Sequence, residues 1–158
     1  MTSKDILEPL KTALQLEIEG RGFFAEAAQK VTGRQARQTF EFLAAEEEKH
    51  IEHIRKFYES IEQGDVTLPV GLNDTDAERN LAAFNEKLAE LKDELKPTLT
   101  DIEAYEYALK FENGAEDFYR EKMNETDNPE VKKFYRWLIG EEELHSKVLE
   151  SCLKFARD

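Results

Sequence analysis

Cysteine is almost absent from this sequence of 158 residues, in which Cys152 is the single example. One cysteine excludes an intrachain disulfide and a Cys-x-x-Cys metal site, and a chain without disulfides fits a reducing, cytoplasmic setting. Glycine and proline are scarce as well, at 7 and 4 residues. Because these two residues interrupt helices most strongly, their scarcity predicts long helices.

Long apolar runs and a basic surface are also missing. No hydrophobic stretch approaches the length needed to cross a bilayer, and the residues after Met1 hold no apolar signal-peptide core. The net charge is −13, from 35 acidic and 22 basic residues, which disfavours nucleic acid and anionic membranes as partners. A hydrophobic content of 40% argues against disorder. We therefore expect one soluble, cytoplasmic domain that binds neither nucleic acid nor membrane.

Apolar residues recur at helical spacing in the first part of the chain and predict two helices. Asp5-Ile6-Leu7-Glu8 has the pattern of a capping box, with its first residue as the N-cap of a helix that ends near Val31. After a turn at Thr32-Gly33, a second helix is predicted over 34–63, and Gly64 ends it.

The segment 64–99 breaks this pattern and is predicted to be a long crossover. Within it, large apolar residues at three- and four-residue spacing predict an extra amphipathic helix over 75–95. Because its apolar stripe contains no metal-ligand residue type, we interpret it as a packing element. Thr100-Asp101-Ile102-Glu103 has the pattern of a capping box and predicts the start of a third helix that runs to about residue 126. Asn128-Pro129 predicts the N-cap and first residue of a fourth helix that reaches the C-terminus.

The second hairpin, 100–158, repeats the first, 5–63, without a gap. Adding 95 to a position in the first half gives its counterpart in the second, and the apolar neighbours match as well. The matched acidic and imidazole residues are Glu17, Glu47 and His50 in the first half, and Glu112, Glu142 and His145 in the second. The sequence therefore predicts a single domain made of two copies of a helical hairpin joined by the crossover.

The spacing of these residues also predicts where they meet. Glu17 and Glu47 lie 15 residues before and 15 residues after Thr32. At about 1.5 Å per residue, both stand about 22 Å from the turn and face each other across the hairpin. His50 follows Glu47 by three residues, which places the pair on one helix face. With the same spacing in the second hairpin, four carboxylates and two imidazoles meet at one level of a bundle, where two divalent metal ions would compensate the carboxylate charge.

Ordinary surface glutamates and core histidines are the alternative interpretation. The chain has 26 Glu among 158 residues, so a single Glu-x-x-His is weak evidence for a metal site. The motif occurs twice, each time with a Glu 30 residues upstream, and both copies keep the register of the whole repeat. This double coincidence favours the metal site.

The pattern resembles the ferritin-like superfamily, and most of all its rubrerythrin branch, over essentially the whole chain. The resemblance rests on four motifs: Glu17-x5-Phe23-Phe24, Glu47-x2-His50, Glu112-x5-Phe118-Tyr119 and Glu142-x2-His145. It implies an all-α, ferritin-like four-helix bundle that holds two iron ions, with zinc or manganese as alternative metals. The implied roles are terminal ligands for Glu17 and Glu112, bridging ligands for Glu47 and Glu142, and nitrogen ligands for His50 and His145.

Three departures from rubrerythrins modify this expectation. Rubrerythrins usually carry a rubredoxin domain with Cys-x-x-Cys iron ligands, and its absence here implies an external electron donor, such as a rubredoxin-like protein or a small reductant. They also tend to carry a further Glu one turn after the third-helix ligand, where this chain has Ala115, so the site resembles the symmetric centre of bacterioferritins. The Tyr that often follows the first-helix ligand by two turns is Phe24 here, and Tyr119 occupies the equivalent place in the second half.

The resemblance implies a non-haem di-iron oxidoreductase that reduces peroxide or dioxygen with electrons from that donor. Two alternatives stay open: a ferroxidase or iron-storage protein of bacterioferritin type, and a non-redox, metal-binding structural dimer. We expect a homodimer, because the amphipathic helix at 75–95 can pack on its own bundle or on that of a partner.

Several residues next to the predicted ligands are candidates for supporting roles. Tyr119, seven residues after Glu112, is the candidate catalytic residue: it is placed to hydrogen-bond a ligand carboxylate or to relay an electron, and a plain core tyrosine is the alternative. Glu46 and Glu141 precede the two bridging glutamates. They are candidate acceptors for the N–H of the opposite histidine, or else solvated surface residues. His53 has no counterpart in the second half and is interpreted as an ordinary histidine.

Overall fold

The computed structural model describes residues 2–69, 72, 82, 86 and 99–157. These residues form four long helices: α1 (Ser3–Lys30), α2 (Arg34–Glu62), α4 (Leu99–Glu125) and α5 (Pro129–Arg157). Within these ranges there is no strand, and none of the helices combines the length and the apolar character that a bilayer span requires. The extra helix predicted at 75–95 lies outside the described residues, apart from two isolated positions.

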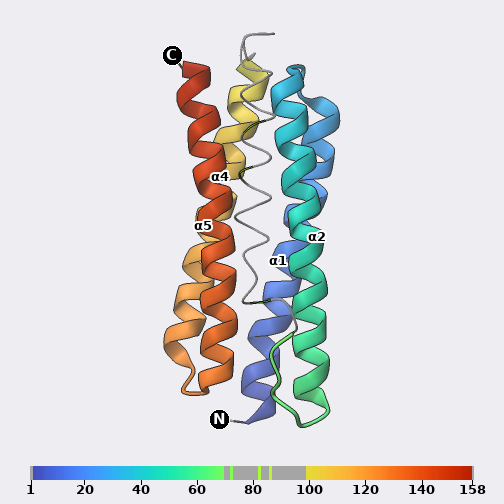
Figure 1. Ribbon diagram of the computed structural model, residues 1–158, viewed down its shortest axis with the longest axis vertical. Helices are drawn as coiled ribbons and strands as arrows, with labels where there is room; N and C mark the ends of the chain where they lie inside the picture. The colour runs from blue at the N-terminus through green and yellow to red at the C-terminus, as the bar shows by residue number, and fades with distance from the viewer. Residues whose placement is uncertain (1, 70–71, 73–81, 83–85, 87–98, 158) are drawn as a thin grey trace.

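The four helices lie side by side along the long axis of the molecule and pair as two antiparallel hairpins (Figure 1). α1 packs on α2, and α4 packs on α5. α2 and α4 both run toward the lower end of the view, so they are parallel, as expected when a long crossover separates them. The predicted all-α bundle of two hairpins is confirmed.

The helix starts show which capping predictions were right. Thr2, not Asp5, is the N-cap of α1: the Thr2 hydroxyl accepts from Asp5 N at 3.3 Å, and Asp5 Oδ2 accepts from Thr2 N at 2.9 Å. The predicted cap was wrong by one turn, because a threonine three residues before Asp5 completes the box earlier. α4 begins at Leu99, so Thr100 lies inside that helix instead of capping it. The cap of α5 is confirmed, since Asn128 Oδ1 accepts from Glu130 N at 2.9 Å and from Val131 N at 3.2 Å.

One buried carboxylate ties the two hairpins together at the α1–α2 turn. Asp101 on α4 is fully buried and accepts from Thr32 N at 2.9 Å and from Gly33 N at 3.0 Å. A Cβ on Gly33 would lie 2.6 Å from Asp101 Oδ2, so glycine is needed for this close approach. These bonds satisfy backbone donors at the start of α2, where no side chain of the helix itself supplies a cap.

Two buried aromatic clusters fill the bundle on either side of a polar layer. The first contains Phe24 and Phe40, whose ring centroids are 6.1 Å apart. The second contains Phe57 and Phe134, which stack with centroids 4.4 Å apart. Along α1, Glu17 lies between members of the two clusters. Burying one side chain of this size contributes about 1.5–3 kcal/mol, so the clusters hold the helices together above and below that layer.

Candidate metal centre

The polar layer contains all six residues that the sequence predicted as metal ligands. Their exposed fractions are between 0% and 2%. α1 contributes Glu17, α2 contributes Glu47 and His50, α4 contributes Glu112, and α5 contributes Glu142 and His145. On α2 and α5 the Glu and the His occupy the inward face, three residues apart, among apolar residues that are also buried. The structure therefore brings the six side chains together from four helices.

A glycine lets α1 and α4 pack closely beside this layer. Gly20 lies one turn after Glu17 on α1 and is buried. A Cβ at this position would come within 2.9 Å of Phe111 Cε1 and 3.6 Å of Glu47 Cδ. An added Cβ would overlap the ring of Phe111 on α4, whereas its distance to Glu47 is an ordinary contact, so the lack of a side chain at Gly20 allows the close packing of α1 on α4.

Two of the carboxylates are shared between the two histidines. Glu47 Oε2 lies 3.9 Å from His50 Nδ1, and Glu47 Oε1 lies 3.5 Å from His145 Nδ1. Glu142 repeats this arrangement, with Oε1 at 3.4 Å from His50 Nδ1 and Oε2 at 3.8 Å from His145 Nδ1. Each of the two glutamates thus presents one oxygen to each half of the layer, which is the disposition of a bridging carboxylate.

The other two carboxylates each face a single histidine. Glu17 Oε2 lies 3.3 Å from His50 Nδ1, and Glu112 Oε2 lies 3.7 Å from His145 Nδ1. The two imidazole rings lie nearly parallel, 13° apart, with centroids separated by 5.2 Å. The layer therefore divides into two sets of three carboxylates and one imidazole that share Glu47 and Glu142.

The unpaired atoms of the layer test whether metal ions fit it. Among the buried side-chain atoms that have no hydrogen-bond partner in the described part of the chain, six belong to this layer: Glu47 Oε1, both oxygens of Glu112, both oxygens of Glu142, and His145 Nδ1. A buried carboxylate without donors is costly, and bound cations remove that cost. The ligand atoms of each set lie within 4.8 Å of one another. Oxygen-rich sites with one imidazole suit iron and manganese and also accept zinc, so the residues fit a pair of divalent metal ions.

The two halves of the layer differ in their proton affinities. Burial lowers the pKa of His50, but the charge of Glu17 and hydrogen bonds to Glu141 and Glu17 outweigh it and raise that pKa to about 10. Burial raises the pKa of Glu112, and the nearby imidazole of His145 only partly opposes this. In the first half a proton is therefore held on the imidazole of His50, while in the second half the carboxyl of Glu112 holds a proton more tightly than usual.

Tyr119 supports one carboxylate from the opposite hairpin. It is fully buried, and its hydroxyl donates to Glu17 Oε1 at 2.6 Å. Burial and the nearby charge of Glu17 raise the pKa of Tyr119 well above its ordinary value, so the hydroxyl stays a donor. This is one of the two interactions predicted for Tyr119, and its catalytic role stays a prediction. The equivalent position in the first half is the buried Phe24, which has no hydroxyl to offer Glu112.

The glutamates before the bridging residues behave differently from each other. Glu141 Oε1 lies 3.5 Å from His50 Nε2, across the bundle, as predicted for an acceptor of the opposite histidine. Burial raises the pKa of Glu141, but the hydrogen bond and the charge of His50 outweigh it and lower that pKa. Glu46 is also buried, at 5% exposure, yet its Oε2 pairs with Lys49 Nζ at 2.9 Å on its own helix. Neither residue is the solvated surface glutamate of the alternative interpretation.

Trp137 is a neighbour of the layer that the sequence pattern did not identify. Its ring packs edge-on against His50, with centroids 5.5 Å apart, and against His53, with centroids 5.0 Å apart. The available signal was its position two turns before His145, since residues eight apart lie near one helix face. His53 itself stays outside the layer; burial and the charge of His50 lower its pKa.

Comparison with known proteins agrees with this geometry. The chain matches the family model of rubrerythrin over residues 8–153, a range that includes all six residues of the layer. No curated protein and no solved structure gives a significant match. The chain therefore belongs to the rubrerythrin family, and its bundle is of the ferritin-like type.

Proposed function

We propose that this protein is a non-haem di-iron oxidoreductase that reduces peroxide or dioxygen with electrons from an external donor. The observation that carries the proposal is the pair of buried Glu₃His sets that share Glu47 and Glu142. A dry layer with so many unpaired acceptor atoms has no structural benefit of its own, because apolar residues would stabilise the same core better.

The six residues of the layer would hold the two ions. Glu17 and His50 would bind one ion, Glu112 and His145 the other, and Glu47 and Glu142 would bind both. Iron in this site would supply one-electron redox chemistry and activation of an oxygen ligand. Zinc or manganese would be the alternative occupants.

The remaining residues of the chain position this set. Tyr119 would hold Glu17 in place through its short hydrogen bond, and Glu141 would hold the ring of His50 by accepting from Nε2. The aromatic clusters on both sides exclude bulk water from the layer. A well-positioned and dry ligand set is what a redox metal centre requires from its protein.

A ferroxidase or iron-storage role of bacterioferritin type is the second candidate, because the layer contains no fifth carboxylate from α4. Ala115 is buried within the apolar cluster beside the layer. The next residue, Glu116, forms an ion pair with Arg120, in which Glu116 Oε1 lies 2.8 Å from Arg120 Nη2. The two ligand sets are therefore alike in composition. Size-exclusion chromatography separates the candidates, since storage requires a closed shell and the oxidoreductase is proposed to be a homodimer.

The test of the proposed function is anaerobic loading with ferrous iron followed by stopped-flow mixing with peroxide or with dioxygen. Oxidation of the loaded centre within seconds by either oxidant, and its restoration by rubredoxin or another small electron donor, would support the oxidoreductase. Glu48→Ala is the matched control, because Glu48 is exposed and pairs with Arg21 away from the layer. If neither oxidant reacts at a useful rate, the redox proposal fails and a non-redox metal site remains.

A further inference from the structure

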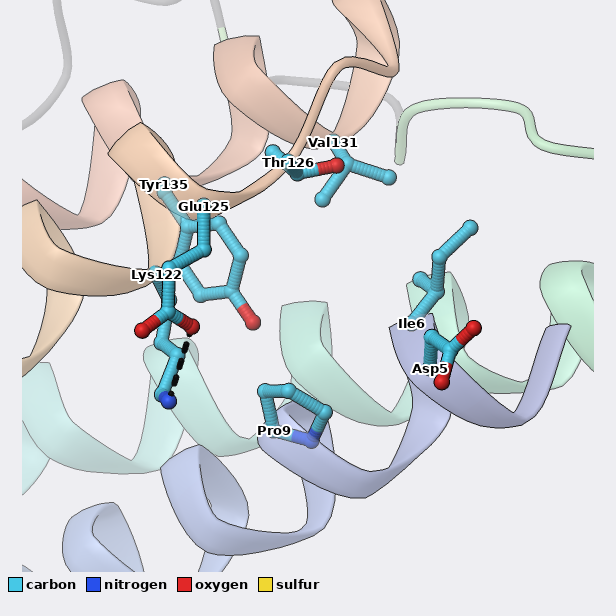
Figure 2. A pocket seen from close by; sticks show the side chains of 8 residues that line it. All are labelled: Asp5, Ile6, Pro9, Lys122, Glu125, Thr126, Val131 and Tyr135. Atoms are coloured by element: carbon cyan, nitrogen blue, oxygen red, sulfur yellow. Dashed lines mark hydrogen bonds and ion pairs between the residues drawn. The ribbon is translucent and has the colours of Figure 1, made fainter. Parts of the chain in front are cut away.

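A second feature of the molecule lies at the end of the bundle where α1 and α5 begin. A pocket of about 310 Å³ opens between the start of α1, the end of α4 and the start of α5. Figure 2 shows the residues that line it, which are Asp5, Ile6, Pro9, Lys122, Glu125, Thr126, Val131 and Tyr135. This volume is at the lower end of the range of pockets that hold small molecules, and far larger than a single water molecule needs.

Tyr135 gives the pocket a polar group that the protein leaves without a partner. The side chain is 2% exposed, and its hydroxyl has no hydrogen-bond partner within the described ranges. In Figure 2 this hydroxyl points into the space between Lys122, Pro9 and Ile6. Burial, together with the charge of Glu125, raises the pKa of Tyr135, so the group is a neutral hydroxyl. A buried hydroxyl without a partner is costly, and a ligand that bonds to it removes that cost.

The charged groups around the pocket are already paired. Lys122 Nζ binds Glu125 Oε2 at 3.0 Å, and Asp5 Oδ2 accepts from both the backbone N–H and the hydroxyl of Thr2 at 2.9 Å. The lining carries one positive and two negative side chains, which disfavours an anion. Ile6, Pro9 and Val131 are apolar, and the hydroxyl of Thr126 already accepts from Asn128 N at 3.3 Å.

A proline in α1 removes one helical hydrogen-bond donor beside the same wall. Pro9 lies inside α1 and has no N–H, so it cannot donate the usual helical hydrogen bond to the carbonyl of Asp5. Asp5 and Pro9 both line the pocket. The wall thus combines a neutral hydroxyl on α5 with apolar side chains from α1 and α5.

We propose that this pocket binds a small uncharged molecule with a hydroxyl or carbonyl group on an apolar body, and that the hydroxyl of Tyr135 is its main polar contact. The site is independent of the proposed redox function. It nevertheless lies close to the metal layer, because the ring of Tyr135 stacks on that of Tyr119 with centroids 6.2 Å apart, and Tyr119 bonds to Glu17.

Phenol is the probe, and toluene is its counterpart without a hydroxyl. The methyl signals of Ile6 and Val131 are followed by NMR in the full-length, metal-free chain, so that failure of metal loading does not affect the result. Phenol is expected to shift these signals saturably, with a Kd of about 1 mM for a ligand of this size. Tyr135→Phe should weaken phenol binding about fivefold and leave toluene binding unchanged.

Tyr105→Phe is the matched control, because Tyr105 is equally buried but belongs to the other aromatic cluster. It should leave phenol binding unchanged. Benzoate should bind more weakly than phenol, because the lining carries two negative side chains and only one positive side chain. The proposal is wrong if phenol causes no saturable shift, or if Tyr135→Phe binds phenol as tightly as the wild type. The first result would mean that the pocket holds solvent only, and the second that the hydroxyl of Tyr135 is not the polar contact of the ligand.

Discussion

The two halves of the metal layer each contribute two glutamates and one histidine but have different surroundings. In the first half, Glu17 accepts a hydrogen bond from Tyr119, and Glu141 lies next to Nε2 of His50. In the second half, both oxygens of Glu112 lack partners within the described residues, and Phe24 stands where a tyrosine would mirror Tyr119. The duplication thus preserves the metal ligands, while the groups that position them have diverged.

This difference implies unequal roles for the two halves. Hydrogen bonds hold Glu17 and His50 in place before any metal arrives. Neither oxygen of Glu112 nor Nδ1 of His145 has a hydrogen-bond partner within the described residues, so more of their ordering must come from the metal itself. We therefore expect the first half to bind its metal ion more tightly than the second.

The largest expected effect comes from removing a residue that both halves share. Glu47→Ala deletes a carboxylate that faces both histidines and should abolish loading of the metal pair. Ferrous titration with metal analysis measures this loss, and circular dichroism checks that the helices persist. Glu48→Ala, which changes an exposed neighbour, should load like the wild type. A Glu47→Ala protein that still holds two ions would mean that the assignment of shared ligands is wrong.

The second prediction concerns pH. His50 has its pKa raised from 6.5 to about 10, so its proton stabilises the metal-free fold below pH 6.5, and this stabilisation is lost as the pH rises through about 10. Glu112 also has a raised pKa, so it too favours the fold only while it is protonated. The unfolding free energy of the metal-free protein should fall between pH 6.5 and 10, by up to about 1.4 kcal/mol per pH unit for one proton.

Denaturant unfolding at several pH values measures this slope. Metal binding must displace the proton of His50, so metal affinity should rise over the same interval. His50→Gln should flatten the unfolding slope between pH 6.5 and 10. A metal-free protein that becomes more stable from pH 7 to pH 9 would contradict the assignment of the proton to His50.

A third prediction exchanges the surroundings of the two halves. Tyr119→Phe removes the donor to Glu17 and should cost about 1.5–3 kcal/mol of stability in the metal-free protein, because the bond is to a buried carboxylate. Phe24→Tyr would add a hydroxyl on the side of Glu112 and should recover part of that loss. Chemical denaturation measures both changes. If Tyr119→Phe changes stability no more than Tyr105→Phe does, the hydrogen bond does not position Glu17.

The smallest effect is expected from Glu141. Glu141→Gln keeps an acceptor near His50 Nε2 but removes the negative charge, so the pKa of His50 should fall while metal loading changes less than tenfold. NMR titration of the imidazole signals measures the shift. Glu46→Gln is the control, because Glu46 pairs with Lys49 on its own helix. Equal shifts of His50 in the two variants would remove the distinction between these glutamates.

The sequence predicted the fold and the meeting of the six residues because both follow from spacing. Helical periodicity and the constant offset of the repeat determine which residues share a level of the bundle, as they do for Glu17 and Glu47. The N-cap of α1 was misplaced because Thr2 and Asp5 form the same kind of box as Asp5 and Glu8. Local pattern alone cannot choose between two overlapping boxes.

The differences between the halves were much harder to predict. The bond of Tyr119 to Glu17 and the packing of Trp137 on His50 join different hairpins, so they depend on how the hairpins dock. The pocket at Tyr135 arises where three helix ends meet, and no periodicity within one helix indicates it. Side-chain contacts of this kind follow from tertiary packing, which sequence spacing does not determine.

The central claim is that the layer binds a pair of metal ions through two shared carboxylates. An anaerobic ferrous titration of the full-length chain, followed by absorbance and by metal analysis after desalting, tests it most directly. We expect a break at two ions per chain, with the first ion bound more tightly than the second. A break at one ion per chain, or no saturable binding, would contradict it.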